Sequence, residues 1–233
     1  MAVDGSVFAS KVRHRGPAFR GRFTGMSTTL MAPLAARIKR NWHALRRGLW
    51  FRRGPYRRMD RLYLLEDPWQ LASPREHARF ALTNTLIESF VPNCSALLEI
   101  GSGEGEQTAH LLKVADAVTG IEVSETAVNR ARQAVPDAEF LVGCAEDAAR
   151  LLGGRRFDIV TACEMLYYAP DAGRMLETLK TLAPRILVTT YDRRTRAVAA
   201  HLLGPGWSRL NDIVAHDTRW HCHLWEDPGH AAI

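Results

Sequence analysis

The fold of this chain is decided by the stretch Leu97-Leu98-Glu99-Ile100-Gly101-Ser102-Gly103-Glu104-Gly105-Glu106. An apolar run followed by three alternating glycines predicts a buried strand, a tight turn and the start of a helix. Glycine permits positive φ angles and a close approach of the backbone to a ligand. The next helix, expected over residues 107–114, directs its free N–H groups at the same point. The stretch therefore predicts a site for a nucleotide-like cofactor.

The spacing of these glycines discriminates between cofactors. A dinucleotide-binding loop has its third glycine three residues after the second, and Glu106 occupies that position here. An acid there would repel a pyrophosphate. The three acids Glu99, Glu104 and Glu106 instead suit a ligand with a positively charged end, such as the amino group and sulfonium of S-adenosylmethionine (SAM). An ordinary glycine turn between strand and helix is the alternative.

Length and composition are those of a soluble globular protein. The chain has 233 residues, of which 46% are hydrophobic and 24% charged. No apolar run approaches the roughly 20 residues that span a bilayer. Four widely spaced cysteines without a paired pattern favour reduced thiols over a disulfide framework. We therefore expect a cytoplasmic protein, with a membrane-peripheral location as the alternative.

Positive charge is concentrated at the N-terminal end. Residues 1–61 carry 15 Lys and Arg against two acids, a net charge of +13, so the overall +6 leaves −7 for residues 62–233. Nucleic acid is therefore not an expected partner, because the basic charge is confined to one segment. The expected units are a disordered basic tail over 1–32, a basic amphipathic helix over 33–60 and a catalytic domain over 61–233.

The basic helix has more than one interpretation. Its apolar stripe is expected to pack on its own domain, and the alternatives are contact of residues 33–53 with an anionic membrane surface or with a polyanion. The oligomeric state stays open.

Further apolar runs predict a doubly wound α/β protein. A helix is expected after Ser73, with that serine as N-cap and Pro74 at the first position, and another over 193–203. In addition to the first strand, the sheet is expected to contain parallel strands and an antiparallel hairpin at its C-terminal edge. These strands lie at 117–122, 139–143, 156–162, 185–191, 209–216 and 219–226. The expected result is a seven-stranded, mostly parallel, Rossmann-like sheet.

Acids follow the second and third expected strands. Glu122 ends the second strand, where a carboxylate can accept hydrogen bonds from both hydroxyls of a ribose. Ligands of doubly wound sheets lie at the carboxyl ends of the strands, so the loop at 144–147 is expected to face the adenine. There Glu146 or Asp147 would accept a hydrogen bond from the exocyclic amine, and a helix-capping role is the alternative for either.

Three side chains leave the fourth strand at the reactive end of such a cofactor, namely Glu164, Tyr167 and Tyr168. Methyl transfer from a sulfonium is an in-line displacement, in which the protein positions the acceptor and excludes water. Glu164 can take a proton from the acceptor, and the tyrosines can orient the acceptor or stack on a sugar ring. For Tyr168, simple packing is an equal alternative.

Two other groups of residues receive weaker interpretations. Glu76, Arg79 and Asn84 on the first helix suit either a surface ion pair or a lid over the cofactor. The run at 221–223, His-Cys-His, invites a metal interpretation, but strand alternation sends the cysteine to the opposite face from the two histidines. No metal is expected.

Three segments together carry a family resemblance. Asp67-Pro68-Trp69-Gln70-Leu71, the glycine loop and Glu164-Met165-Leu166-Tyr167-Tyr168 resemble the nodulation protein S family of SAM-dependent N-methyltransferases, over residues 64–190. The resemblance implies SAM as cofactor and a small-molecule or glycan acceptor, with methylation of a sugar amine first. Methylation of a sugar hydroxyl or of another small-molecule oxygen is the alternative. A nicotinamide-dependent oxidoreductase and a non-catalytic binding module are the alternatives of other classes.

The predicted site combines the motif residues with those that the resemblance implies. Its catalytic residues are Glu164, Tyr167 and Tyr168. Its cofactor-binding residues are Trp69, Arg79, Glu99, Gly101, Ser102, Gly103, Gly105, Glu122, Val123, Ala145, Glu146, Asp147 and Cys163.

Overall fold

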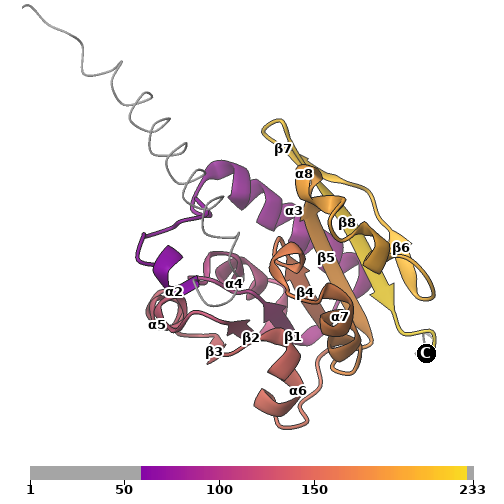
Figure 1. Ribbon diagram of the computed structural model, residues 1–233, viewed down its shortest axis with the longest axis horizontal. Coiled ribbons are helices and arrows are strands. Elements are labelled where there is room, and N and C mark those ends of the chain that lie inside the picture. The colour runs from indigo at the N-terminus through magenta and orange to yellow at the C-terminus, as the bar shows by residue number, and fades with distance from the viewer. Residues whose placement is uncertain (1–58, 230–233) are drawn as a thin grey trace, which may run out of the picture. The chain divides into compact units, whose positions relative to one another are not determined.

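One mixed sheet organises the part of the chain that the computed structural model describes, residues 59–229 (Figure 1). Its strands are β1 (Cys94–Ile100), β2 (Ala115–Glu122), β3 (Glu139–Val142), β4 (Ile159–Cys163), β5 (Arg185–Tyr191), β6 (Trp207–Arg209), β7 (Ile213–Ala215) and β8 (Thr218–Glu226). They lie in the order β3-β2-β1-β4-β5-β8-β6, with β7 also paired to β8. Strands β1 to β5 pair in parallel, and β8 pairs with its neighbours in the antiparallel sense.

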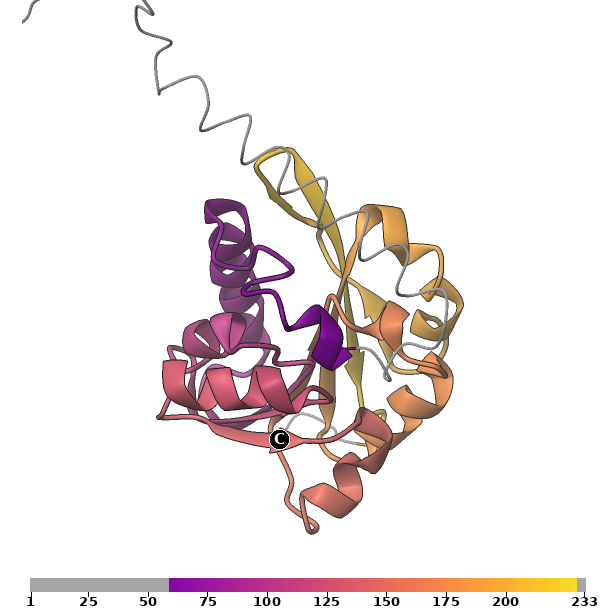
Figure 2. The same ribbon diagram turned by 60° about the vertical axis from the view of Figure 1, so that its left-hand side comes forward.

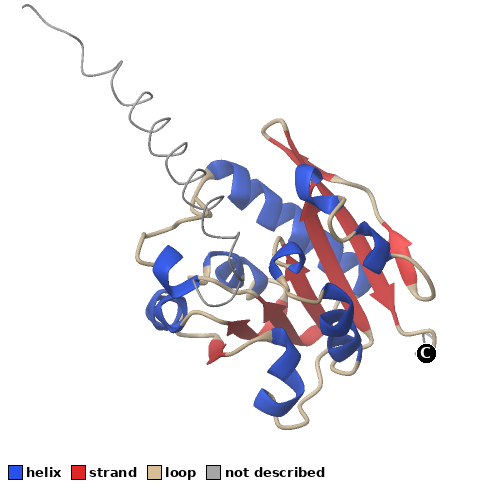
Figure 3. Cartoon of the chain, viewed as in Figure 1, coloured by secondary structure: helices blue, strands red, loops and turns tan. Residues whose placement is uncertain are grey.

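Helices connect these strands and precede the first of them. The α-helices are α2 (Met59–Leu62), α3 (Pro74–Phe90), α4 (Glu106–Leu111), α5 (Glu125–Ala134), α6 (Ala148–Leu151), α7 (Ala172–Lys180) and α8 (Asp192–Thr195). Short 3₁₀ turns are η3 (Ala145–Asp147), η4 (Leu166–Tyr168) and η5 (Ala199–Leu202). Figure 3 shows the strands as a central layer between these helices.

The hydrophobic core has two halves, one on each face of the sheet. Successive residues of a strand point to opposite faces, and in β1 both Leu97 and Leu98 are completely buried. Leu97 packs with Ile87 of α3 and Leu111 of α4, whereas Leu98 packs with Met175 of α7 and other residues of that face. The two groups of helices lie on either side of the sheet in Figure 2. A continuous apolar run is thus what a strand covered on both faces requires.

The chain order reverses beside β1, which has β2 on one side and β4 on the other. Such a reversal leaves a crevice at the carboxyl ends of the two central strands, the usual ligand site of doubly wound sheets. The predicted fold class is therefore confirmed, with one correction: the sheet has eight strands rather than seven.

The correction arises because the strand expected over 209–216 is interrupted. β6 ends at Arg209 and β7 begins at Ile213. Between them lies Asp212, whose carboxylate accepts a hydrogen bond of 2.7 Å from Arg219. Aspartate and asparagine disfavour strands, and the contacts of Asp212 with Arg219 and His221 of β8 are made by its side chain rather than by backbone pairing.

Two expected helices are shorter than predicted. The helix after the glycine loop ends at Leu111 rather than at residue 114. The helix expected over 193–203 breaks into α8 and η5, where Thr195 donates a hydrogen bond of 3.2 Å to the carbonyl of Tyr191. A hydroxyl that bonds a backbone carbonyl four residues earlier weakens a helix.

Helix starts were predicted more accurately. Helix α3 begins at Pro74, but the hydroxyl of Ser73 makes no capping bond and is buried without a hydrogen-bond partner among residues 59–229. In α5 the hydroxyl of Ser124 accepts the capping bond from the N–H of Ala127 at 3.3 Å.

Other expectations concern the N-terminal segment. The basic tail over 1–32 and almost all of the basic helix over 33–60 lie outside the described residues.

Within residues 59–229, none of the helices has the length and apolar character that a membrane span requires. All four cysteines are free thiols.

Candidate functional site

The glycine loop has the backbone conformation that its sequence predicts. Gly101, Gly103 and Gly105 have φ angles of 76°, 55° and 90°, all in the left-handed region. A Cβ atom on Gly101 would lie 2.9 Å from the Cβ of Met165, closer than carbon atoms approach without contact strain. Glycine is therefore required here both for its φ angle and for space.

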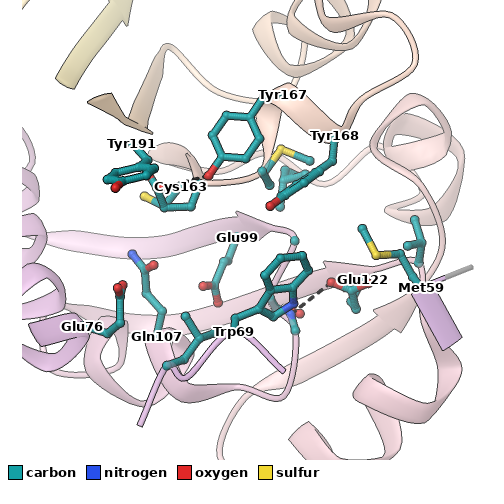
Figure 4. A pocket seen from close by; sticks show the side chains of 18 of the residues that line it. Met59, Trp69, Glu76, Glu99, Gln107, Glu122, Cys163, Tyr167, Tyr168 and Tyr191 are labelled. Carbon is teal, nitrogen blue, oxygen red and sulfur yellow. Dashed lines mark hydrogen bonds between the residues drawn. The ribbon is translucent and has the colours of Figure 1, made fainter. Parts of the chain in front are cut away.

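A cavity of about 380 Å³ lies beside this loop, at the carboxyl ends of β1, β2 and β4. Figure 4 shows Tyr167, Tyr168 and Tyr191 on one side of it and Glu76, Glu99 and Gln107 on the other. The predicted site residues that line it are Trp69, Arg79, Glu99, Gly101, Ser102, Gly103, Glu122, Val123, Ala145, Cys163, Glu164, Tyr167 and Tyr168.

Three predicted site residues do not line the cavity. Gly105 is the N-cap of α4, and a Cβ there would lie 3.1 Å from Val135, so its role is to start the helix and pack it closely. Asp147 is exposed, and its carboxylate accepts a hydrogen bond from the thiol of Cys144 at 3.3 Å. Glu146 precedes it in the same 3₁₀ turn, of which only Ala145 faces the cavity.

Glu122 is held beside the glycine loop by backbone donors. Its Oε2 accepts from the N–H of Gly103 at 3.1 Å, and its Oε1 accepts from the N–H of Ser124 at 3.0 Å. The side chain is buried and lines the cavity. Each carboxylate oxygen has two lone pairs, so the fixed carboxylate can still accept hydrogen bonds from a diol.

Of the three acids near the loop, only Glu99 lines the cavity. Thr108 donates a hydrogen bond of 2.5 Å to its carboxylate, and burial raises the pKa of Glu99 to about 7. A buried carboxyl with this pKa is well suited to a cationic ligand group, which would favour its ionised form.

Glu104 and Glu106, which were grouped with Glu99 as acids suited to a cationic ligand, do not line the cavity. Glu104 accepts hydrogen bonds from the N–H of Asp67 at 2.9 Å and from Arg130 at 2.5 Å. It therefore ties the segment before α3 to helix α5. Glu106 lies on the other side of the loop, 3.6 Å from the ring of His77.

Helix α3 contributes a buried polar cluster rather than surface ion pairs. Arg79 is only 1% exposed, and its Nε donates to Glu76 at 2.7 Å. Its Nη1 donates to the side-chain oxygen of Gln107 at 3.2 Å. The Nε2 of Gln107 is buried and has no hydrogen-bond partner within the described residues. All three residues line the cavity, and Arg79 and Gln107 offer N–H donors to a polar ligand.

Glu164 lies in a strained, half-buried position. Its φ of 60° is unusual for a residue with a side chain. Tyr167 donates a hydrogen bond of 2.8 Å to its Oε2, and the hydroxyl of Thr189 lies 3.4 Å from its Oε1. Burial raises the pKa of Glu164 to about 7. A carboxyl with a pKa near neutrality is suited to proton transfer.

Aromatic rings cover the same part of the cavity. The ring of Tyr168 packs edge-on against Tyr167 at 4.6 Å between centroids and lies 5.3 Å from Trp69. The indole N–H of Trp69 donates to the hydroxyl of Tyr63 at 3.2 Å. Tyr168 therefore both packs and faces the cavity, so its two sequence interpretations are compatible.

Several cavity residues were missed by sequence reasoning. Some of them reach the site only through tertiary pairing, as in the register that places Tyr191 opposite Trp220, whereas Leu71, Ile100 and Met165 lie within the quoted motifs. The missed residues are Met59, Tyr63, Leu71, Arg75, Ile100, Gln107, Ile121, Gly143, Met165, Tyr191, Arg194, Thr218 and Trp220, and Glu76 was named only as a lid candidate. The described part of the chain contains no cluster of His, Cys, Asp or Glu side chains that could hold a metal ion.

Comparison with known proteins agrees with this geometry. Residues 98–184 match the methyltransferase domain family. Nodulation protein S of Rhizobium tropici is 28% identical over 134 residues, which cover 55% of this chain and 56% of that protein. The ubiquinone biosynthesis O-methyltransferase of Coxiella burnetii is 26% identical over 113 residues, 46% of this chain and 48% of that protein.

The fold is shared with a solved structure. The N-methyltransferase NodS from Bradyrhizobium japonicum, in complex with S-adenosyl-l-homocysteine, superposes with a TM-score of 0.57 at 18% identity and covers 75% of this chain and 99% of that one. The matched segments span about half the length of the curated relatives named above. The resemblance to class I methyltransferases and to nodulation protein S is thus confirmed.

Proposed function

We propose that this chain, whose residues 98–184 match a methyltransferase domain, binds SAM in the cavity beside Gly101–Gly103 and transfers its methyl group to a small-molecule acceptor. The observation that carries the proposal is the fixed carboxylate of Glu122 next to a glycine loop with positive φ angles. This pair of features suits a nucleoside, because the carboxylate accepts from the ribose while the loop leaves space for it.

The polar groups of the cavity fit the other parts of SAM. Glu99 suits the amino group of the methionine end, and the Arg79 guanidinium with the free N–H of Gln107 suits its carboxylate. The sulfonium makes the methyl carbon electrophilic. The residues of this chain hold the cofactor, exclude water and orient the acceptor.

For the acceptor we infer an amine or hydroxyl nucleophile that meets the methyl group near Glu164. The Glu164 carboxylate takes the proton that the acceptor loses, the new bond forms between methyl carbon and acceptor atom, and the sulfonium leaves as a neutral thioether. The similarity to nodulation protein S favours N-methylation of a sugar amine. The similarity to a ubiquinone biosynthesis O-methyltransferase favours O-methylation as the second candidate.

Titration calorimetry with SAM tests the proposal. We expect SAM to bind the full chain, and Glu122→Ala and Gly103→Val to weaken binding at least tenfold while thermal unfolding shows a folded protein. Glu125→Ala, on an exposed site next to the loop, and Gly153→Val, at a positive φ of 59° in open space, are the matched controls. Absence of SAM binding to the unchanged protein, or binding of NADH instead, would reject the assignment.

The acceptor can be found without assuming its identity. Incubation of the protein with methyl-labelled SAM and fractionated extracts should label a pool of small molecules or glycans. Label in nucleic acid alone would overturn the acceptor part of the proposal and leave the cofactor part standing.

A further inference from the structure

The cavity continues beyond the residues assigned to SAM. Its second end is formed by Tyr191, Arg194 and Thr218, from β5, α8 and β8, whereas the ring of Trp220 on β8 lies 5.8 Å from the Arg79 guanidinium. These elements are separated from the glycine loop by β4, which carries Glu164 at its carboxyl end. The second end therefore lies on the acceptor side of Glu164.

The second end of the cavity contains a positively charged side chain, that of Arg194. Arg194 is exposed, lines the cavity, and its guanidinium lies 5.9 Å from the centroid of the Tyr167 ring. No carboxylate of residues 59–229 forms an ion pair with it. The nearest acid in the sequence, Asp192, instead accepts from His221 at 2.7 Å. Arg194 is thus available to an anion.

The cofactor's own carboxylate has a different partner. Gln107 lies on helix α4, which directly follows the glycine loop, and Arg79 donates a hydrogen bond to it. There Glu76 forms ion pairs of 2.7 Å with both Arg75 and Arg79. In the proposed complex the remaining donors of Arg79 and Gln107 hold the carboxylate of the cofactor, so Arg194 stays available to a second anion.

Building on the proposed function, we propose that the acceptor carries an anionic group, a carboxylate or a phosphate, which Arg194 binds while the nucleophile of the acceptor lies at Glu164. A guanidinium binds either oxyanion through paired hydrogen bonds. Tyr167 joins the two points, because its ring packs under Arg194 and its hydroxyl donates to Glu164. An acceptor with both groups would be oriented before methyl transfer.

Neighbouring residues provide a matched control. Arg193 is exposed, like Arg194, and lies on the same short helix, but it does not line the cavity. Arg194→Gln and Arg193→Gln therefore remove the same charge from the same helix, inside and outside the proposed subsite.

The test is an NMR titration of the full chain with inorganic phosphate and, separately, malonate, at constant ionic strength. Each titration is run with and without saturating S-adenosylhomocysteine. We expect one of the two anions to bind, Arg194→Gln to weaken it at least tenfold, and Arg193→Gln to change it less than twofold. Preference for phosphate indicates a phosphorylated acceptor, and preference for malonate a carboxylated one.

Three results would overturn this inference: no anion binding to the unchanged protein, equal losses in both variants, or weaker S-adenosylhomocysteine binding in Arg194→Gln. The last would place Arg194 in the cofactor subsite. Failure of the proposed function looks different, since then S-adenosylhomocysteine does not bind the unchanged protein, and the anion titration without it is still informative.

Discussion

The hydroxyl of Tyr167 donates a hydrogen bond of 2.8 Å to Oε2 of Glu164, and both side chains line the cavity. The bond joins a base candidate to the aromatic ring against which Arg194 packs. Burial opposes ionisation of Glu164, whereas the nearby Arg79 and the Tyr167 hydroxyl favour it. Since these influences leave the pKa near neutrality, small changes around Glu164 should alter its charge at physiological pH.

The first prediction concerns the titration of Glu164. With a pKa of about 7, this group is mostly protonated at pH 6 and mostly ionised at pH 8. Because only the ionised form accepts a proton, methyl transfer should rise with pH through neutrality and level off above it. Tyr167→Phe removes a hydrogen-bond donor that favours the carboxylate, so the pKa of Glu164 should rise. The pH at which the rate of methyl transfer increases should then move to a higher value.

Carbon-13 NMR of glutamate-labelled protein measures this pKa without an acceptor. The signal that disappears in Glu164→Gln identifies the group. If Tyr167→Phe moved its titration to lower pH, or left it unchanged, the hydrogen bond would not act as described.

The second prediction concerns the strained backbone of Glu164. Its φ of 60° favours glycine. Glu164→Gly and Glu164→Ala both remove the carboxylate, so their difference isolates the backbone. We expect Glu164→Gly to be the more stable by about 1 kcal/mol in urea unfolding, although neither variant should support proton transfer. Equal stability of the two variants would mean that the local backbone relaxes freely.

The third prediction compares two glycines with positive φ angles. Gly153 has open space around it, whereas a Cβ on Gly101 would lie 2.9 Å from that of Met165. Gly153→Ala should therefore destabilise the protein only through its φ angle. Gly101→Ala should lower the free energy of unfolding by about 1–3 kcal/mol more, because of overpacking. Urea unfolding of both variants measures the difference. Met165→Ala should not rescue Gly101→Ala, because it keeps the offending Cβ, and a full rescue would contradict this explanation.

Local sequence was informative where local chemistry decides the outcome. The glycine loop, the acid at Glu122 and the apolar strands each depend on conformational freedom, hydrogen bonding or burial that neighbouring residues reveal. These features sufficed to predict the sheet and the part of the cavity that lies beside the glycine loop. Most of the predicted cavity residues do line it.

Tertiary placement was not accessible in the same way. Glu104 and Glu99 look equivalent in sequence, but the carboxylate of Glu104 accepts a hydrogen bond from Arg130 on another helix. Trp220 reaches the cavity only because β8 pairs with β5. The pairing joins distant parts of the chain, and the hydrophobic pattern within either strand does not indicate which strand is its partner. For Arg79 the sequence left a surface ion pair and a lid over the cofactor open, because nothing local indicates that Glu76 and Gln107 would satisfy it when buried.

The last prediction concerns proton release on cofactor binding. Glu99 is buried, its pKa is raised to about 7, and in the proposed complex it faces the cationic amino group of SAM. A nearby positive charge lowers the pKa of a carboxyl. At pH 7 a group with that pKa is about half protonated, so binding should release about half a proton from Glu99. Calorimetry in buffers of different ionisation enthalpy measures this number as a slope. Glu99→Gln keeps a hydrogen-bond acceptor for Thr108 at the same place and should remove most of the slope. An unchanged slope would assign the proton to another group and would place the amino group of the cofactor away from Glu99.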